Sequence, residues 1–214
     1  MKKKKNPDDP QIEYKLLLIG ESNVGKTTIF NKYIFNRLDK NASSTIGVDF
    51  EAKNFSYKKK KYSIKLFDTA GQERFHSVTK AYFHMGDAYI IVFDLTNENS
   101  LKEIPNWINA LKEEKEDPKF IIIGNKNDLK NQISQEVINE YLKDYNHLFI
   151  KTSAIKNENI KEAIHKIIDI IEGDDNNLEN NDDNDENEQN ENVIKINITK
   201  DKIKDNNYSN SRCC

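Results

Sequence analysis

Cysteine is nearly absent from this sequence of 214 residues, which contains only Cys213 and Cys214 at its end. Two adjacent cysteines at one end of a chain cannot cross-link a fold, so a fold stabilised by disulfides is excluded. We therefore expect both cysteines to serve a purpose outside the folded core.

Long apolar runs are absent as well. No stretch approaches the roughly 20 apolar residues that a helix needs to cross a bilayer. The Met1-Lys2 start offers neither the apolar region of a secretory signal nor a glycine at position 2 for myristoylation. These absences predict a cytoplasmic protein rather than a secreted or membrane-spanning one.

Basic residues are absent from residues 173–192, which hold nine carboxylates, so the rest of the chain is net basic although the whole has a formal charge of −3. From 173 to 212 Asn, Asp and Glu dominate, and they bury too little apolar area to offset a chain entropy of about 1 to 2 kcal/mol per residue. We therefore expect a disordered acidic and Asn-rich tether at 173–212. A disordered basic extension at 1–12 is favoured over a membrane contact of Lys2–Lys5. Residues 13–172 are left as one domain.

Strands and helices alternate within residues 13–172. Apolar runs predict six strands, at 13–19, 48–57, 61–67, 88–93, 120–123 and 148–150. Helical apolar spacing predicts helices at 26–34, 100–115, 134–145 and 158–171. A turn at 58–60 makes the second and third strands a hairpin, although it lacks the usual glycine. The expected class is α/β, with a six-stranded, mostly parallel sheet, helices on both faces, and a ligand beyond the carboxyl ends of the strands.

A glycine loop follows the first predicted strand and opens the first helix. Residues 20–27 have the spacing G-x-x-x-x-G-K-[ST] of a phosphate-binding loop. Its backbone N–H groups can surround phosphate oxygens, Lys26 supplies a cation to the β- and γ-phosphates, and the Thr27 hydroxyl can ligate Mg²⁺. Asn23 stands where glycine is frequent, and asparagine tolerates left-handed backbone angles.

The base is indicated by Asn125-Lys126-Asn127-Asp128, which follows the strand at 120–123. The Asp128 carboxylate can accept two hydrogen bonds from guanine, and adenine has no matching pair of donors. A partly unpaired buried carboxylate costs on the order of 1 to 3 kcal/mol, which would convert this geometry into base selectivity. Alone, the loop is more simply interpreted as an Asx turn.

A third motif, Asp68-Thr69-Ala70-Gly71-Gln72, follows the strand at 61–67. It predicts a carboxylate near the metal, a glycine N–H near the terminal phosphate, and a glutamine that can orient the attacking water.

These motifs, with Thr152-Ser153-Ala154 after the last strand, resemble the small GTPase family over residues 13–172. Thr45-Ile46-Gly47-Val48-Asp49-Phe50 and Gln72-Glu73-Arg74-Phe75 are similar to the Rab branch. The resemblance implies a P-loop GTPase fold and a switch that hydrolyses GTP slowly in vesicle and membrane traffic. It implies that Thr45 reaches Mg²⁺ only when the γ-phosphate is present and that Gly71 reports that phosphate, so that hydrolysis releases both switch loops.

The resemblance also assigns the individual residues. Asn125 and Asp128 hold guanine, Lys126 packs along the base and ribose, the Ala154 N–H meets the guanine oxygen, and Ser153 braces the loop. The expected metal ligands are Thr27, Thr45 and Asp68, and the catalytic residue is Gln72. The expected contacts to GTP or GDP are Gly20, Ser22, Asn23, Val24, Gly25, Lys26, Thr27, Thr28, Thr45, Gly71, Asn125, Lys126, Asp128, Ser153 and Ala154.

Two positions depart from the family pattern. Leu38 stands where relatives generally place an aromatic ring against guanine, and Ile155 where a lysine usually follows Ser-Ala. Because an aromatic contact adds roughly 0.5 to 1.5 kcal/mol, we expect nucleotide affinity about tenfold weaker than is typical, unless Lys126 compensates.

Partners follow from the resemblance. They are an exchange factor, a GTPase-activating protein, prenylation and membrane-extraction machinery, and effectors that contact both switches and Phe50, Phe67 and Tyr82, unless these three are plain core aromatics. No nucleic acid is expected. Cys213 and Cys214 match a doubly geranylgeranylated terminus, which would anchor the protein on the cytosolic face of an endomembrane; unmodified thiols are the alternative.

Two other functions stay open. A non-catalytic module would hold nucleotide without hydrolysis, and Gln72 argues against it. An ATP-using P-loop enzyme would have to explain Asp128.

Overall fold

The computed structural model describes residues 11–38, 47–69, 82–145, 147–173 and 193–196. All six predicted strands are present: β1 (Ile12–Ile19), β2 (Val48–Tyr57), β3 (Lys60–Thr69), β4 (Ala88–Asp94), β5 (Phe120–Asn125) and β6 (His147–Lys151). The strands lie in the order β2-β3-β1-β4-β5-β6-β7, in which every neighbouring pair from β3 to β6 is parallel and β2 pairs antiparallel with β3. The expected mostly parallel α/β sheet is confirmed.

A short strand, β7 (Val193–Ile196), extends the sheet at its β6 edge. It pairs antiparallel with β6, from Val193 opposite Ile150 to Ile196 opposite His147. These four residues correct the expected tether at 173–212. The run Val-Ile-Lys-Ile has high strand propensity, and β6 would otherwise present unpaired backbone groups at the edge.

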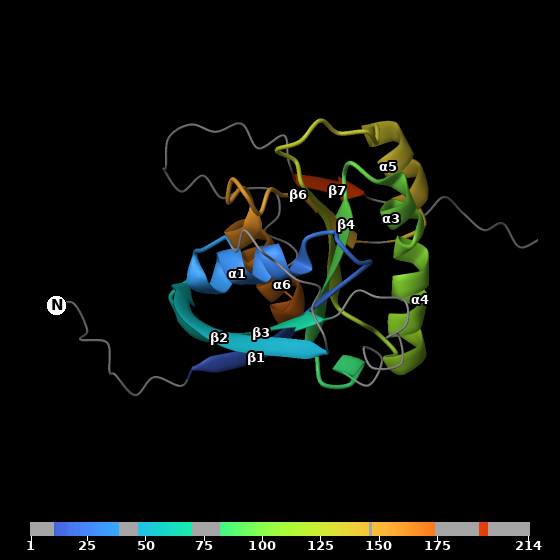
Figure 1. Cartoon of the computed structure of the whole chain (residues 1–214). Helices are drawn as coiled ribbons and strands as arrows, with labels where there is room; N and C mark the ends of the chain where they lie inside the picture. Colours follow the sequence, from blue (N-terminus) through green and yellow to red (C-terminus); the bar gives the residue numbers. More distant parts are fainter. Residues whose placement is uncertain (1–10, 39–46, 70–81, 146, 174–192, 197–214) are drawn as a thin grey trace, which may run out of the picture.

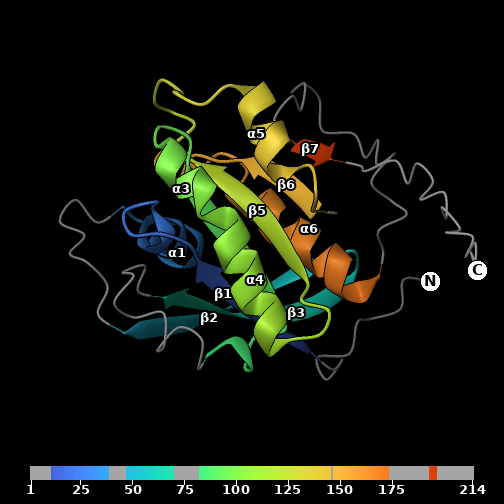
Figure 2. The same cartoon turned by 90° about the vertical axis from the view of Figure 1, so that its right-hand side faces the viewer.

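Helices cover both faces of the sheet, as Figures 1 and 2 show. α1 (Lys26–Phe35) and α6 (Ile160–Glu172) lie on one face, and α3 (Glu98–Lys102), α4 (Ile104–Glu114) and α5 (Gln135–Leu142) lie on the other. Two apolar clusters correspond to these layers. One joins Ile29, Ile64 and Ile164, and the other joins Phe93, Trp107 and Phe149. No helix within the described ranges is long and apolar enough to span a membrane.

The predicted helix at 100–115 is divided in two. α3 ends at Lys102 and α4 begins at Ile104, with Glu103 between them. Pro105 lies in the first turn of α4, where a missing N–H costs nothing. In a continuous helix its ring would clash with the carbonyl group of Leu101, so the proline starts a new helix.

Two lysines form the predicted hairpin turn. Tyr57 pairs with Lys60, which leaves Lys58 and Lys59 as the loop, at φ values of 45° and 65°. Positive φ at both central residues is the requirement of the two-residue turn whose twist matches the strands. Lysine replaces the usual Asn-Gly here, and Lys58 Nζ forms an ion pair with Asp169 Oδ1 at 2.8 Å. The tight turn thus brings the β2–β3 hairpin to the last two turns of α6.

Candidate nucleotide-binding site

The P-loop connects β1 to α1, and two of its glycines lie against other backbone or side-chain atoms. A Cβ on Gly20, whose φ is +134°, would lie 2.2 Å from the carbonyl oxygen of Val92. A Cβ on Gly25, at φ +99°, would lie 2.3 Å from Nδ2 of Asn125. Both positions therefore require glycine. Asn23 adopts φ 63°, so the expectation that asparagine accepts a left-handed conformation here is confirmed.

Lys26 lies inside this loop. Its side chain is buried, and its Nζ donates to the carbonyl oxygens of Gly20 and Glu21 at 2.7 Å each. Burial lowers the pKa of Lys26 to about 8, while Asp68 and Glu21 act in the opposite direction. The amine is therefore still mostly protonated at neutral pH. A cation held among backbone carbonyls beside a glycine loop suits a phosphate oxygen.

Asp68 and Thr27 have the chemistry of a magnesium site. Asp68 is buried at the end of β3, opposite Leu18 of β1, and interacts electrostatically with Lys26. The next residue, Thr69, fixes this strand end by donating from Oγ1 to the Leu18 carbonyl oxygen at 2.7 Å. Thr27 lies in the first turn of α1. A carboxylate and a hydroxyl are hard oxygen ligands, and Mg²⁺ completes its shell with waters and substrate phosphates, so the donor set fits this ion.

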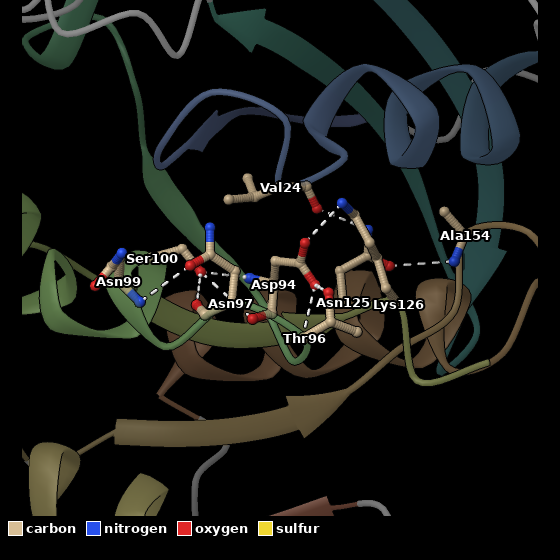
Figure 3. A network of polar contacts seen from close by, with 9 residues as sticks. All are labelled: Val24, Asp94, Thr96, Asn97, Asn99, Ser100, Asn125, Lys126 and Ala154. Atoms are coloured by element: carbon tan, nitrogen blue, oxygen red, sulfur yellow. Dashed lines mark hydrogen bonds and ion pairs between the residues drawn. The ribbon is translucent and has the colours of Figure 1, made fainter. Parts of the chain in front are cut away.

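Asn125 joins the phosphate loop to the base loops. Its Nδ2 donates to the Val24 carbonyl oxygen at 2.9 Å, and its Oδ1 accepts from Ala154 N at 3.2 Å and from Thr152 Oγ1 at 3.3 Å. Figure 3 shows the amide between Val24 on one side and Ala154 on the other. Three segments that are distant in the sequence therefore meet on one buried side chain. This junction brings together the predicted phosphate and base elements.

Lys126 is held by a carboxylate that was not among the predicted site residues. Lys126 Nζ lies 2.7 Å from Asp94 Oδ2, and Asp94 Oδ1 accepts from both N and Oγ1 of Thr96 at 2.8 Å (Figure 3). Asp94 is buried at the end of β4, after six apolar residues. A carboxylate that ends a fully buried strand at the ligand edge is the signal that could have found it. The ion pair fixes the direction of the Lys126 side chain.

Asp128 is bound to the last loop of the site. Ser153 Oγ donates to Asp128 Oδ1 at 2.5 Å and accepts from Lys156 N at 3.0 Å. Asn127 N also donates to the Thr152 carbonyl oxygen at 3.0 Å. The structure thus brings Ser153 to Asp128, as a brace would require. The Ala154 amide donates to Asn125, and its assignment to the guanine oxygen stays a prediction.

Apolar side chains at two sequence departures are exposed. Leu38 is 41% exposed and Ile155, in the loop after Ser153, is 59% exposed. Ser22 and Thr28 are half-buried in the P-loop and the first turn of α1. Leu38 and Ile155 are available to a ligand, but neither is an aromatic ring or a cation.

α4 contacts the P-loop through Trp107, which was not among the predicted site residues either. Trp107 Nε1 donates to Glu21 Oε1 at 3.2 Å, although the two residues are 86 positions apart.

The three aromatic residues expected to contact effectors lie close to one cluster. Phe50 stacks on Phe67 with ring centroids 5.1 Å apart, and Tyr82 packs against the same core cluster as Phe67. Phe50 is 55% exposed, so it is more than a core aromatic.

Several predicted site residues lie outside the described residues. They are Thr45, Gly71, Gln72, Cys213 and Cys214.

Comparisons with known proteins agree with this geometry. The Ras family model matches residues 15–173. The Ras-related protein Rab-32D of Dictyostelium discoideum is 36% identical over 177 residues, which cover 78% of each chain. The Ras-related protein Rab-8B of Homo sapiens is 39% identical over 153 residues, 70% of this chain and 74% of its own. The chain therefore belongs to the Ras family and is a Rab-type small GTPase, a switch that hydrolyses GTP in membrane traffic.

Proposed function

We propose that the site at the carboxyl edge of the sheet holds GTP with Mg²⁺, and that different residues of the site bind the phosphates and the base. Phosphates would lie on the backbone of residues 20–27 and on Lys26, and guanine between Lys126, Asp128 and Ala154. The observation that carries this proposal is the Asn125 side chain, which bonds to both Val24 and Ala154. A ligand that spans a phosphate loop and a base loop needs the two loops at a fixed distance from each other. The hydrogen bonds of Asn125 hold them at that distance.

Guanine selectivity would come from Asp128. Its Oδ1 accepts from Ser153, which gives a fixed direction to the carboxylate that would accept two hydrogen bonds from guanine. Adenine offers one exocyclic amine and no adjacent N–H donor, so it would leave part of the carboxylate's hydrogen-bonding capacity unused. Each buried hydrogen-bonding group that adenine leaves without a partner would weaken its binding by on the order of 1 to 3 kcal/mol.

Hydrolysis would be slow in-line attack by water. We infer that Thr27, Asp68 and Thr45 hold Mg²⁺, which would neutralise charge on the β- and γ-phosphates. Lys26 supplies a further positive charge from inside the loop, and Gln72 orients the attacking water. Thr45 and Gly71 would respond to the γ-phosphate, and its loss would release both switch loops. A GTPase-activating protein could contribute an arginine worth about 10³ to 10⁵ in rate, and an exchange factor would release GDP.

The chain ends would place this switch on a membrane. We infer that Cys213 and Cys214 carry two geranylgeranyl groups after action of the prenylation machinery. Two chains, each stabilising by about 0.8 kcal/mol per buried CH₂, would anchor the domain on the cytosolic face of an endomembrane. Membrane-extraction machinery would be needed to remove it. Effectors would contact both switches and the exposed Phe50 beside Phe67, with Tyr82 close by.

The first experiment measures GTP and ATP binding by competition and single-turnover hydrolysis with Mg²⁺. The full chain is compared with Gln72→Leu and with the matched control Gln132→Leu, an exposed glutamine beyond β5. We expect GTP-selective binding in all three and turnover lost only in Gln72→Leu. Tight binding without turnover in the parent chain would favour the non-catalytic module, and turnover unchanged in Gln72→Leu would contradict the role of Gln72. Preference for ATP would contradict the whole proposal.

The anchor has a separate test. The chain and a Cys213→Ser, Cys214→Ser variant are incubated with geranylgeranyl diphosphate and prenylation machinery, then floated with vesicles. We expect flotation only of the parent chain, with a mass increase of two isoprenoid groups. Equal flotation of both chains would contradict a lipid anchor at these cysteines.

A further inference from the structure

A cavity of about 280 Å³ lies between α1, β2 and α6, and none of its lining residues belongs to the nucleotide-binding site. Tyr33 and Asn36 come from the end of α1, Phe55 from β2, and Ile160 and His165 from α6. The remaining lining residues are Lys32, Lys53, Asn157 and Lys161. The cavity thus combines an aromatic wall with three cations.

The cations have no acidic counterpart in the lining, which contains neither Asp nor Glu. Within the part of the chain that the structure describes, Lys32, Lys53 and Lys161 form no ion pair. Asp169, one turn beyond His165 in α6, is already bonded to Lys58 and to Tyr57. Among the described residues, therefore, no carboxylate forms an ion pair with the three cations of the cavity.

Lys53 is the most constrained of the three lysines. Its Nζ lies 4.6 Å from the centroid of the Tyr33 ring and donates to the Tyr33 carbonyl oxygen. Burial, and then the charge of Lys161, lower the pKa of Lys53. A nearby anion would act against both effects, since it would stabilise the charged amine. The arrangement favours a negatively charged ligand over an empty, self-repelling cluster.

The wall is aromatic and neutral. His165 is stacked between two rings, with centroids 5.6 Å from Phe55 and 4.0 Å from Tyr57. Burial lowers the pKa of His165 to about 4, so the imidazole is uncharged at neutral pH. Burial raises the pKa of Tyr33, so its phenol keeps its proton. A planar ring can lie against this wall while an anionic group meets the lysines.

We propose that this cavity binds a small organic anion with one aromatic ring and one phosphate group. Ligand pockets commonly measure about 300 to 1,000 Å³, so this one suits a single substituted ring and is too small for a nucleotide. Three lysines suit the two negative charges of a phosphate monoester better than they suit a neutral or cationic ligand. Tyr33, Phe55 and Ile160 provide the contact surface for the ring.

The test uses phenyl phosphate as the probe and the full chain in excess GDP and Mg²⁺, so that the P-loop is already supplied with phosphate. Binding is followed by calorimetry and by amide chemical shifts. We expect saturable binding that shifts the amides of Asn36, Asn157 and Lys161. Inorganic phosphate lacks the ring and benzyl alcohol lacks the phosphate group, so each should bind at least roughly tenfold more weakly than phenyl phosphate.

Three variants decide whether the cavity is responsible. Lys53→Gln and Lys161→Gln should each weaken phenyl phosphate binding roughly tenfold, as loss of a charge-assisted contact does. Lys166→Gln removes the same charge from α6 outside the lining and should change binding less than about twofold. Equal weakening by Lys166→Gln, shifts confined to residues 20–27, or no saturation up to about 10 mM would each overturn the proposal.

Discussion

At the residue scale, the site depends on a few buried polar side chains that bond to distant segments. Asn125 is the clearest case, because one amide serves the P-loop and the Ala154 loop together. The resemblance to small GTPases assigned Asn125 to the guanine site. It did not predict the bond to Val24, because a motif does not state which backbone group faces a side chain. Asp94 and Trp107 were not predicted as site residues for the same reason: their partners, Lys126 and Glu21, are far away in the sequence.

Removing the Asn125 amide tests this structural role. Asn125→Ala leaves the Val24 carbonyl, the Ala154 amide and the Thr152 hydroxyl without their bonds in a buried region. We expect the free energy of unfolding to fall by about 2 to 4 kcal/mol in urea denaturation, and GTP affinity to fall with it. Asn139→Ala, on the exposed side of α5, is the control and should cost less than about 0.5 kcal/mol. A loss for Asn125→Ala no larger than that of the control would contradict the role.

Leu38 tests the altered base pocket. Leu38→Phe restores the ring that relatives generally carry, and an aromatic contact adds roughly 0.5 to 1.5 kcal/mol. We expect GDP to dissociate about 2 to 10 times more slowly, measured with a fluorescent GDP analogue. Met85→Phe, another exposed apolar position, is the control and should leave the rate unchanged. An unchanged rate for Leu38→Phe would show that the Leu38 side chain does not contact the base.

At the element scale, the break in one helix and the edge of the sheet differ most from the sequence expectations. The three lysines at 58–60 carried a turn prediction without glycine, and the structure confirms a two-residue turn at positive φ. Pro105 divided the helix predicted at 100–115. Periodicity alone could not place that break, because the apolar spacing continues across it. β7 was missed because four residues in a polar segment gain a strand only by pairing with β6.

Lys59→Gly tests the hairpin. A non-glycine residue in the left-handed region costs about 1 to 2 kcal/mol, and glycine's greater unfolded entropy offsets roughly half of that. We expect the variant to raise the free energy of unfolding by about 0.5 kcal/mol in thermal or urea denaturation. Lys59→Ala keeps the strain and should leave stability within about 0.3 kcal/mol of the parent. Stabilisation by alanine equal to that by glycine would contradict the backbone argument.

β7 can be tested through the protection of its neighbour. An Ile194→Pro, Lys195→Pro double variant removes two consecutive backbone N–H groups of β7, one of which faces β6 in the alternating antiparallel pattern. We expect faster hydrogen exchange of β6 amides, with a change in global stability below about 1 kcal/mol, because β7 adds only an edge. The same prolines at Lys200 and Asp201 serve as the control and should leave β6 exchange unaltered. Exchange that is equally slow in both variants would exclude β7 as a cover for this edge.

At the scale of the whole molecule, the packing of the helices on the sheet makes stability depend on pH. The packing of α6 against the hairpin buries His165, whose pKa falls to about 4 through burial, with Lys161 and Lys58 lowering it further and Asp169 opposing them. Stability should therefore depend on pH through this side chain. The unfolded chain takes up a proton near the ordinary pKa of about 6.5, and the folded chain does not until about pH 4.

The sign follows from that difference. The contribution of His165 is fully present above about pH 6.5 and is lost as the pH falls toward 4, by at most about 1.4 kcal/mol per pH unit. His165→Phe keeps a ring in the stack and removes the titration. We expect the parent to lose stability more steeply than the variant between pH 6.5 and 4.5 in urea denaturation, and the two to run parallel above pH 7. Parallel curves over the acidic window would contradict a buried neutral imidazole.

The sequence by itself determined the class of the fold, the succession of strands and helices along the chain, and the kind of ligand. These depend on local patterns: apolar periodicity within each element, and motifs whose residues are neighbours in the chain, such as residues 20–27 and 125–128. Only the tertiary structure decided which side chains connect those motifs, where β7 adds to the sheet, and that α1, β2 and α6 enclose a basic cavity. Those features depend on contacts between residues tens of positions apart, and such contacts exist only after the chain has packed.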